Sequence, residues 1–280
     1  GAGKSTLMRM VWGNYLAASG VIRVGGLDVA SAAPRQIIRL RRDTLGYVSQ
    51  FLRVVPRVPT LDVVAEPLLN LPKGTPIKRG SFEESPITET IKANFEDPNI
   101  QLPMLVTAYR TPSMKTREAR ILDMISSILS DGKSSRMYKK IVDDKKMALQ
   151  IGAFNYSQED HGTYILYGLP QSPFTAANLL AEIDEEIVKL QTELISDKDL
   201  QKLQNQFDNQ YVNSNSTIEG IASNLATYHL LYGDVNLINT EIEMYHSITA
   251  EEIREVAKKY LNPNQRMVLD YVPVKDKSQN

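Results

Sequence analysis

The 280-residue sequence contains no cysteine, which excludes disulfide bonds, thiolate catalysis and cysteine-ligated zinc. Histidine is scarce: His161, His229 and His246 are the only three, and they are too scattered along the chain to predict a zinc site. No run of 18 or more apolar residues occurs, so we expect no transmembrane helix. The net charge of −1 gives the protein no general attraction to nucleic acid.

What is present is an ordinary globular composition, with 42% hydrophobic and 23% charged residues. The charge is unevenly distributed. Residues 1–70 carry nine Lys and Arg against four Asp and Glu, whereas residues 71–280 carry 23 against 29. Arginine is the main cation in the first segment and lysine in the second. We interpret this change as a boundary between segments of different origin; local drift in composition would give the same asymmetry.

The chain opens on a short motif, Gly1-Ala2-Gly3-Lys4-Ser5-Thr6, which is followed by apolar residues at helical spacing. The motif matches the second half of the phosphate-binding loop G-x-x-x-x-G-K-[ST], in which glycines let backbone N–H groups approach phosphate oxygens. Lys4 would then neutralise the β- and γ-phosphates, and the Ser5 hydroxyl would bind Mg²⁺. The sequence reads as a piece that begins inside this motif. The simpler alternative is a glycine-initiated helix with a solvated lysine.

A second motif lies about 45 residues after Lys4, where an apolar stretch ends in Gln50 within Gly46-Tyr47-Val48-Ser49-Gln50-Phe51. With this motif, residues 1–69 resemble the ATP-binding subunit of ABC transporters, and more specifically that of the carbon–phosphorus lyase system for phosphonate use. The resemblance implies that a remnant of the nucleotide and Mg²⁺ site is formed by Gly1, Gly3, Lys4, Ser5, Thr6 and Gln50. The L-S-G-G-Q signature and the Walker B carboxylates are absent from the sequence. We therefore expect very weak Mg-ATP binding and no hydrolysis.

The turn-rich stretch 71–76 coincides with the change in composition, and we place the domain boundary there. Residues 1–70 are then a partial ABC ATPase and residues 71–280 a second domain. In the second domain, residue patterns predict strands at 91–95, 101–109, 149–156, 162–169 and 267–272. They predict helices around 121–129 and 134–144, and helices that begin at Ser172-Pro173, Ser196 and Thr249. Together these elements predict an α+β fold, a two-layer α/β sandwich, preceded by a truncated P-loop ATPase fragment.

This order of elements, with the stretch Gly132-Lys133-Ser134-Ser135-Arg136-Met137-Tyr138, resembles the insulinase/pitrilysin-type zinc peptidases, which include mitochondrial processing peptidase. The resemblance is to their carboxy-terminal module and covers residues 71–280. In that family an inverted H-x-x-E-H motif of the first module holds the catalytic zinc, and this motif is absent here. Many relatives also use an Arg and a Tyr to hold the peptide, and the resemblance matches these to Val142 and Leu149. Either this chain belongs to a branch without the pair, or the pair lies in another register. The resemblance therefore implies no catalytic and no metal-binding residue in this chain.

Three functions compete on this evidence. The first is a non-catalytic C-terminal module of an insulinase-type zinc metallopeptidase, which closes a peptide chamber. Its partners would be a zinc-bearing N-terminal module, from the same parent chain or a separate subunit, and the peptide substrate. The second is an ATP-binding subunit of a phosphonate-related ABC system. The third is a regulatory fusion in which nucleotide binding controls a peptidase partner.

The two resemblances abut without the Gly/Ser/Pro-rich spacer that two functional domains normally need. This abrupt join favours a chimera of two unrelated reading frames. No signal peptide precedes the motif, which predicts a bacterial cytoplasmic location for the chain as written. The peptidase resemblance also admits the periplasm, so the sequence leaves the compartment open.

Overall fold

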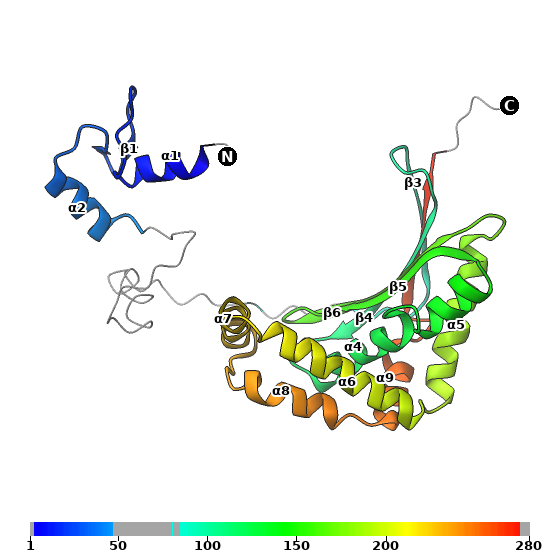
Figure 1. Ribbon diagram of the computed structural model, residues 1–280. Coiled ribbons are helices and arrows are strands. Elements are labelled where there is room, and N and C mark those ends of the chain that lie inside the picture. Colours follow the sequence, from blue (N-terminus) through cyan, green and yellow to red (C-terminus); the bar gives the residue numbers. More distant parts are fainter. Residues whose placement is uncertain (1–2, 47–79, 81–84, 275–280) are drawn as a thin grey trace. The chain divides into compact units, whose positions relative to one another are not determined.

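The computed structural model describes residues 3–46, 80 and 85–274, and they belong to two compact units (Figure 1). The first unit comprises Gly1–Arg79 and the second Gly80–Asn280. Each unit has its own hydrophobic cluster.

The described part of the first unit, residues 3–46, contains two short helices and a two-stranded ribbon. These are α1 (Lys4–Val11), β1 (Arg23–Val24), β2 (Leu27–Asp28) and α2 (Pro34–Asp43). Helix α1 buries none of its residues. Within residues 3–46, three buried side chains form a small cluster, Val29, Ile37 and Leu40. The described part of this unit therefore removes little apolar surface from water.

The second unit is built on a five-stranded sheet. Its strands are β3 (Ile91–Asp97), β4 (Met104–Pro112), β5 (Ala148–Tyr156), β6 (His161–Pro170) and β7 (Arg266–Pro273). They lie in the order β3-β7-β4-β6-β5, in which β3 and β7 are parallel and the other neighbours antiparallel. The predicted hairpin of β5 and β6 is confirmed. Although β3 and β4 follow each other in sequence, the last strand of the chain lies between them.

The helices of the second unit complete the fold. They are α4 (Arg117–Ser130), η1 (Tyr138–Asp144), α5 (Ala176–Thr192), α6 (Asp197–Ser214), α7 (Ile218–Thr227), η2 (Tyr228–Tyr232), α8 (Leu237–His246) and α9 (Ala250–Tyr260). Helices α4, α5 and α9 pack against the sheet, and α6 and α8 pack against α4 (Figure 1). The helices gather on one side of the sheet, so the predicted arrangement of strands with helices on one face is confirmed.

The main core lies between the sheet and these helices. Helix α4 shows why its sequence folds there, because apolar residues recur at helical spacing along one face. Its fully buried side chains include Leu122, Ile125 and Leu129. From the sheet, Leu105 and Leu166 pack into the same cluster. Each such side chain contributes about 1.5–3 kcal/mol through its burial.

Side-chain caps set where most helices begin. The predicted starts at Ser196 and Thr249 are confirmed: the Ser196 hydroxyl accepts the backbone N–H of Asp199, and Thr249 forms a capping box with Glu252. The predicted start at Ser172-Pro173 is wrong. Helix α5 begins three residues later, because Thr175 supplies the cap and pairs reciprocally with Asn178.

A buried ionic contact ties strand β7 to helix α5. The Arg266 guanidinium, on β7, donates from Nη2 to Oδ2 of Asp184 at 2.8 Å and from Nη1 to the Tyr109 hydroxyl at 2.9 Å. Arg266 is only 5% exposed. Burial raises the pKa of Tyr109 to about 12, so its hydroxyl stays protonated. The sheet and α5 are therefore joined by an ion pair in which the Asp184 carboxylate is the counter-ion of the buried Arg266 guanidinium.

Candidate functional site

The predicted nucleotide site is only partly within the described residues. Gly3 is the N-cap of α1 with a φ of 71°, and Lys4, Ser5 and Thr6 form the first turn of this helix. All four residues are exposed. Gly1 and Gln50 lie outside the described residues. The arrangement of a nucleotide site from these six residues therefore stays a prediction.

The three histidines lie on different elements of the second unit. His161 begins β6, His229 lies in η2 and His246 ends α8. His246 contacts a carboxylate of α6, with 2.7 Å between its Nε2 and Oδ1 of Asp208. Among the described residues, no group of three or more His, Cys, Asp or Glu side chains could hold a metal ion. These residues therefore do not fit the zinc of the resembling peptidases, and no step through zinc is derived for them.

The resemblance matches Val142 and Leu149 to the substrate-holding Arg and Tyr of many relatives, and this correspondence stays a prediction. Val142 lies in η1, where it packs against the core. Leu149 lies on β5 and is 51% exposed. Neither side chain has a hydrogen-bond donor or acceptor. Any contact of these residues with a peptide is therefore apolar.

The feature that the sequence reasoning missed is the second face of the sheet. The ladder pairings place side chains in cross-strand rows on the face away from the helices. One row is Ile91, Met267, Ala108, Ile165 and Phe154; the next is Ala93, Leu269, Val106, Tyr167 and Gly152; a shorter third row is Phe95, Tyr271 and Met104. All three rows lack charged side chains. We call these thirteen residues the open face.

Side chains of the open face remain accessible to water in the described structure. Ile91, Phe95, Phe154 and Met267 are more than 40% exposed, and most of the others are half-buried. By contrast, Leu105, Tyr109, Tyr164 and Leu166, on the other face of the same strands, are almost fully buried under the helices. Only one of two apolar faces is covered by the described helices.

Two aromatic pairs stand at opposite flanks of the open face. Phe95 of β3 stacks on Tyr271 of β7, with ring centroids 5.6 Å apart and planes at 9°. On the other flank, Phe154 of β5 meets Tyr167 of β6 edge to face, with centroids 6.3 Å apart. Gly152 is required beneath Tyr167, because a Cβ there would lie 2.5 Å from the Tyr167 ring. The aliphatic residues of β4, β6 and β7 lie between these pairs.

Polar groups occur at the margins of this face. The Tyr271 hydroxyl donates to Asp97 at the end of β3, and this hydrogen bond lowers the pKa of the Asp97 carboxyl. Beyond the first row, at the other end of the strands, Arg110 of β4 donates from Nη1 to the Ser85 carbonyl oxygen. Charged groups therefore border the open face and do not interrupt its middle.

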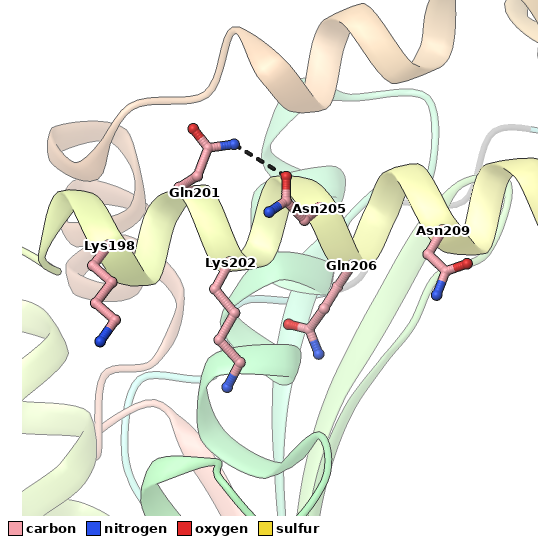
Figure 2. Close-up of a pocket in the computed structure, with 6 residues that line it drawn as sticks. All are labelled: Lys198, Gln201, Lys202, Asn205, Gln206 and Asn209. Carbon is pink, nitrogen blue, oxygen red and sulfur yellow. Dashed lines mark hydrogen bonds between the residues drawn. The ribbon is translucent and has the colours of Figure 1, made fainter.

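A separate hollow of about 480 Å³ follows one side of α6 (Figure 2). It is lined by Lys198, Gln201, Lys202, Asn205, Gln206 and Asn209, which all come from this helix. Lys202 donates to the Ser134 hydroxyl at 2.7 Å, and Gln201 to Asn205 at 3.1 Å. These features are typical of a solvated polar helix face, so we place the candidate site on the sheet instead.

Comparison with known protein families identifies the family of this chain. The model of the family described as "Peptidase M16 inactive domain" matches residues 45–207. The chain belongs to this family. The match begins upstream of the boundary predicted near residue 70 and ends within α6. It covers β3 to β6 together with α4, η1, α5 and part of α6, and it stops before α9 and β7.

Individual relatives agree with this family. The zinc protease PqqE of Helicobacter pylori is 23% identical over 166 residues, which are 59% of this chain and 37% of the relative. A solved protease structure from Helicobacter pylori superposes with a TM-score of 0.69 at 19% identity, over 76% of this chain and 53% of that one. The superposition shows a shared mixed α/β fold. This chain spans about a third of the length of the curated relatives and half of the solved structure.

A different family accounts for another match. The lipoprotein-releasing system ATP-binding protein LolD of Alcanivorax borkumensis is 42% identical over 69 residues, which are 25% of this chain and 30% of that protein. This short match is to an ATP-binding protein, as the resemblance of residues 1–69 to an ABC ATPase implies. It concerns a lipoprotein-releasing system, and the carbon–phosphorus lyase type stays a prediction.

A sequence signal for the open face existed. Strands β4, β6 and β7 contain mainly apolar residues on both faces, as in Met-Leu-Val-Thr-Ala-Tyr of β4 or Tyr-Ile-Leu-Tyr-Gly-Leu of β6. Strands with one solvated face alternate apolar with polar residues, whereas near-continuous apolar runs are typical of strands covered on both faces. The pattern therefore indicated a second covering layer.

Among the described helices, none is long and apolar enough to cross a membrane.

Proposed function

We propose that residues 71–280 act as the non-catalytic C-terminal module of an M16 zinc metallopeptidase. In this role the open face forms a wall of the peptide chamber. The observation that carries the proposal is the uncharged, apolar sheet face, which the described helices leave accessible in a member of a peptidase family. Because peptide chains expose apolar side chains when unfolded, such a surface binds them by burial of apolar area.

The proposal includes a partner that supplies the chemistry. The solved relative is about twice as long as the part that this chain matches, and the curated relative is named a zinc protease. A catalytic zinc site normally needs three protein ligands and a general base. We infer that a zinc-bearing N-terminal module, from the same parent chain or a separate subunit, completes the chamber and performs hydrolysis.

Peptide binding by the full chain tests the role of the open face. A fluorescein-labelled 20-residue unstructured peptide is titrated in the presence of a chelator, and its fluorescence anisotropy is recorded. We expect saturable binding that Phe154→Ser weakens at least about 5-fold, since the substitution removes a large apolar contact. Val188→Ser is the matched control, because Val188 is 49% exposed on the outer side of α5.

Two further observations would complete that test. Mass spectrometry of the peptide should show no cleavage by the chain alone, with or without added zinc. Cleavage that a chelator abolishes and zinc restores would contradict the non-catalytic role. Equal loss of binding in Phe154→Ser and Val188→Ser would show that the open face is not the binding surface.

A second proposal concerns the amino-terminal segment. We propose that residues 1–70 are a partial ABC ATPase segment that retains the Walker A remnant and Gln50, supported by the motif and by the LolD match over 69 residues. We also propose that this segment and the peptidase module come from unrelated reading frames. Amplification across codons 60–80 from the source DNA tests this join, and a single continuous product would refute a chimera.

A further inference from the structure

The inference starts from the chemistry of the open face. Its three rows combine aliphatic and aromatic side chains with no charged group among them. A charged peptide side chain placed over these rows would lose its hydration without gaining a partner, which costs binding free energy. An apolar or aromatic side chain there would gain from burial. The face therefore discriminates between peptides by charge.

The second step is the position of the aromatic pairs. Phe95 and Tyr271 lie on β3 and β7, whereas Phe154 and Tyr167 lie on β5 and β6, at the other flank of the sheet. Aromatic rings provide the largest contact areas on such a surface. A ligand that contacts both outer rings, Phe95 and Phe154, must cross the strands, because strands β7, β4 and β6 separate β3 from β5.

The third step is a length. Neighbouring strands are spaced by about 4.8 Å, so five strands span ~19 Å from β3 to β5. An extended peptide advances about 3.3 Å per residue, and about six residues cover that width. An apolar segment of about three residues spans only the distance from Tyr271 to Tyr167, which β4 alone separates, and cannot also contact Phe95 and Phe154 at the two flanks. A segment longer than about six residues extends beyond both flanks.

From these three observations we infer that the open face selects peptide substrates that carry an extended, uncharged segment of about six apolar or aromatic residues, bound across the strands between the Phe95–Tyr271 and Phe154–Tyr167 pairs. This inference rests on the proposed function, since it names the substrate class of the same surface. It commits to a peptide because the family is a peptidase family and because the uncharged middle offers nothing to an acidic or basic partner.

The experiment uses the full chain and three sets of fluorescein-labelled peptides flanked by Gly-Ser. The first set has central apolar segments of three, six and nine residues. The second has the six-residue segment with two Asp at its centre, and the third the same segment with two Lys. Sedimentation velocity of the free chain, at the concentrations used for binding, reports its oligomeric state.

We expect affinity to rise at least about 10-fold from three to six apolar residues and less than about 2-fold from six to nine, because six residues are needed to contact Phe95 and Phe154 together and further residues lie beyond the sheet. Two Asp or two Lys should each weaken binding about 10-fold or more. Phe95→Ser and Phe154→Ser should both weaken the six-residue peptide, although they lie on opposite flanks. Val188→Ser should leave it unchanged, and circular dichroism should show that all variants are folded.

The outcomes separate the two proposals. If charged and apolar peptides bind equally, or if Phe95→Ser has no effect, the selectivity is overturned while peptide binding, and so the proposed function, stands. If no peptide binds at about 1 mM to a monomeric chain, both proposals fail. If the chain dimerises and Phe154→Ser abolishes the dimer, the open face is covered by a second copy, which overturns the inference.

Discussion

The two units of this protein differ in how many buried side chains pack around the residues that suggest a function. In the first unit, Lys4 and Ser5 belong to a helix that buries none of its residues, and the buried cluster of the described part consists of three side chains. In the second unit, a large cluster joins the sheet to α4, α5 and α9. A motif performs its chemistry only where neighbouring elements fix its geometry. In the described part of the first unit, few packed side chains hold the phosphate-loop motif in place. The second unit has an extensive packed core but carries no catalytic motif.

The same contrast holds for ion pairs. Arg42 and Asp43 of the first unit contact each other while 71% and 43% of their side chains are exposed. The Arg266 side chain, which pairs with Asp184 in the second unit, is only 7% exposed. Water and salt screen the first pair, whereas loss of one partner of the second would leave a buried charge uncompensated. The predictions below test whether the difference in burial has the expected energetic consequences.

The largest effect is expected from a cavity in the second core. Leu122→Ala should lower the free energy of unfolding of the second unit by about 2–5 kcal/mol, because Leu122 is fully buried and its removal leaves an unfilled volume. Urea denaturation followed by far-UV circular dichroism measures this change. Leu7→Ala on α1 is the matched control, since Leu7 is 59% exposed. Equal effects of the two substitutions would erase the distinction between the units.

The next effect concerns the buried ion pair. Asp184→Ala should destabilise the second unit by about 2–4 kcal/mol, because the guanidinium of Arg266 would lose its counter-ion in a desolvated place. Asp43→Ala should leave the melting temperature unchanged, since both members of its pair are exposed. Thermal denaturation of both variants is the measurement. A melting temperature of Asp184→Ala equal to that of the unmodified chain would contradict this prediction.

A smaller effect should depend on pH. The Asp123 carboxylate on α4 accepts a hydrogen bond from Asn155 Nδ2 at 3.1 Å and lies 3.4 Å from the Tyr245 hydroxyl. Burial raises the pKa of this carboxyl to about 6. The folded state therefore binds the proton more tightly than the unfolded state, whose carboxyl titrates near 3.9. The stabilisation is complete below pH 4 and is lost as the pH rises through 6.

For this carboxyl we expect the free energy of unfolding to fall by about 1–3 kcal/mol between pH 4 and pH 7. Asp123→Asn should reduce this slope, because the amide does not titrate and keeps a similar shape. Urea titrations at pH 4.5, 6 and 7.5 measure the slope in both proteins. An equally steep slope in Asp123→Asn would assign the pH dependence to other groups.

The smallest signal is expected from nucleotide binding. Isothermal titration with Mg-ATP should show binding weaker than millimolar, because the first turn of α1 is exposed and α1 has no buried residue. Micromolar binding that Lys4→Ala abolishes would contradict this expectation. It would instead favour the regulatory fusion of a nucleotide site with a peptidase module.

Local signals predicted much of the second unit and failed where tertiary contacts decide. The β5–β6 hairpin and the caps at Ser196 and Thr249 depend on residues within a few positions, and they were predicted correctly. The start of α5 was wrong because Thr175 and Asn178 provide a better cap than Ser172. The insertion of β7 between β3 and β4 is a pairing over more than 150 residues, which no local pattern specifies.

Helix α7 was not predicted, for a different physical reason. None of its residues is buried, and its half-buried positions are Gly220 and Asn224: Asn224 Nδ2 donates to Asn215 Oδ1 at 3.1 Å, and a Cβ on Gly220 would lie 2.1 Å from the Ser214 carbonyl oxygen. Its apolar residues Ile218 and Ile221 are exposed instead. This is the reverse of the usual amphipathic arrangement, so the periodicity does not indicate which side is covered.

The sequence by itself determined the absence of cysteine chemistry and of an H-x-x-E-H motif, the positions of most strands, and the apolar character of both faces of the sheet. These properties depend on composition and on residues close together in the chain. Only the tertiary structure decided which face the helices cover and which residues form the open face. The reason is that β3, β4, β5, β6 and β7 come together in an order set by long-range pairing, which places Phe95 and Phe154 on one surface although 58 residues separate them in sequence.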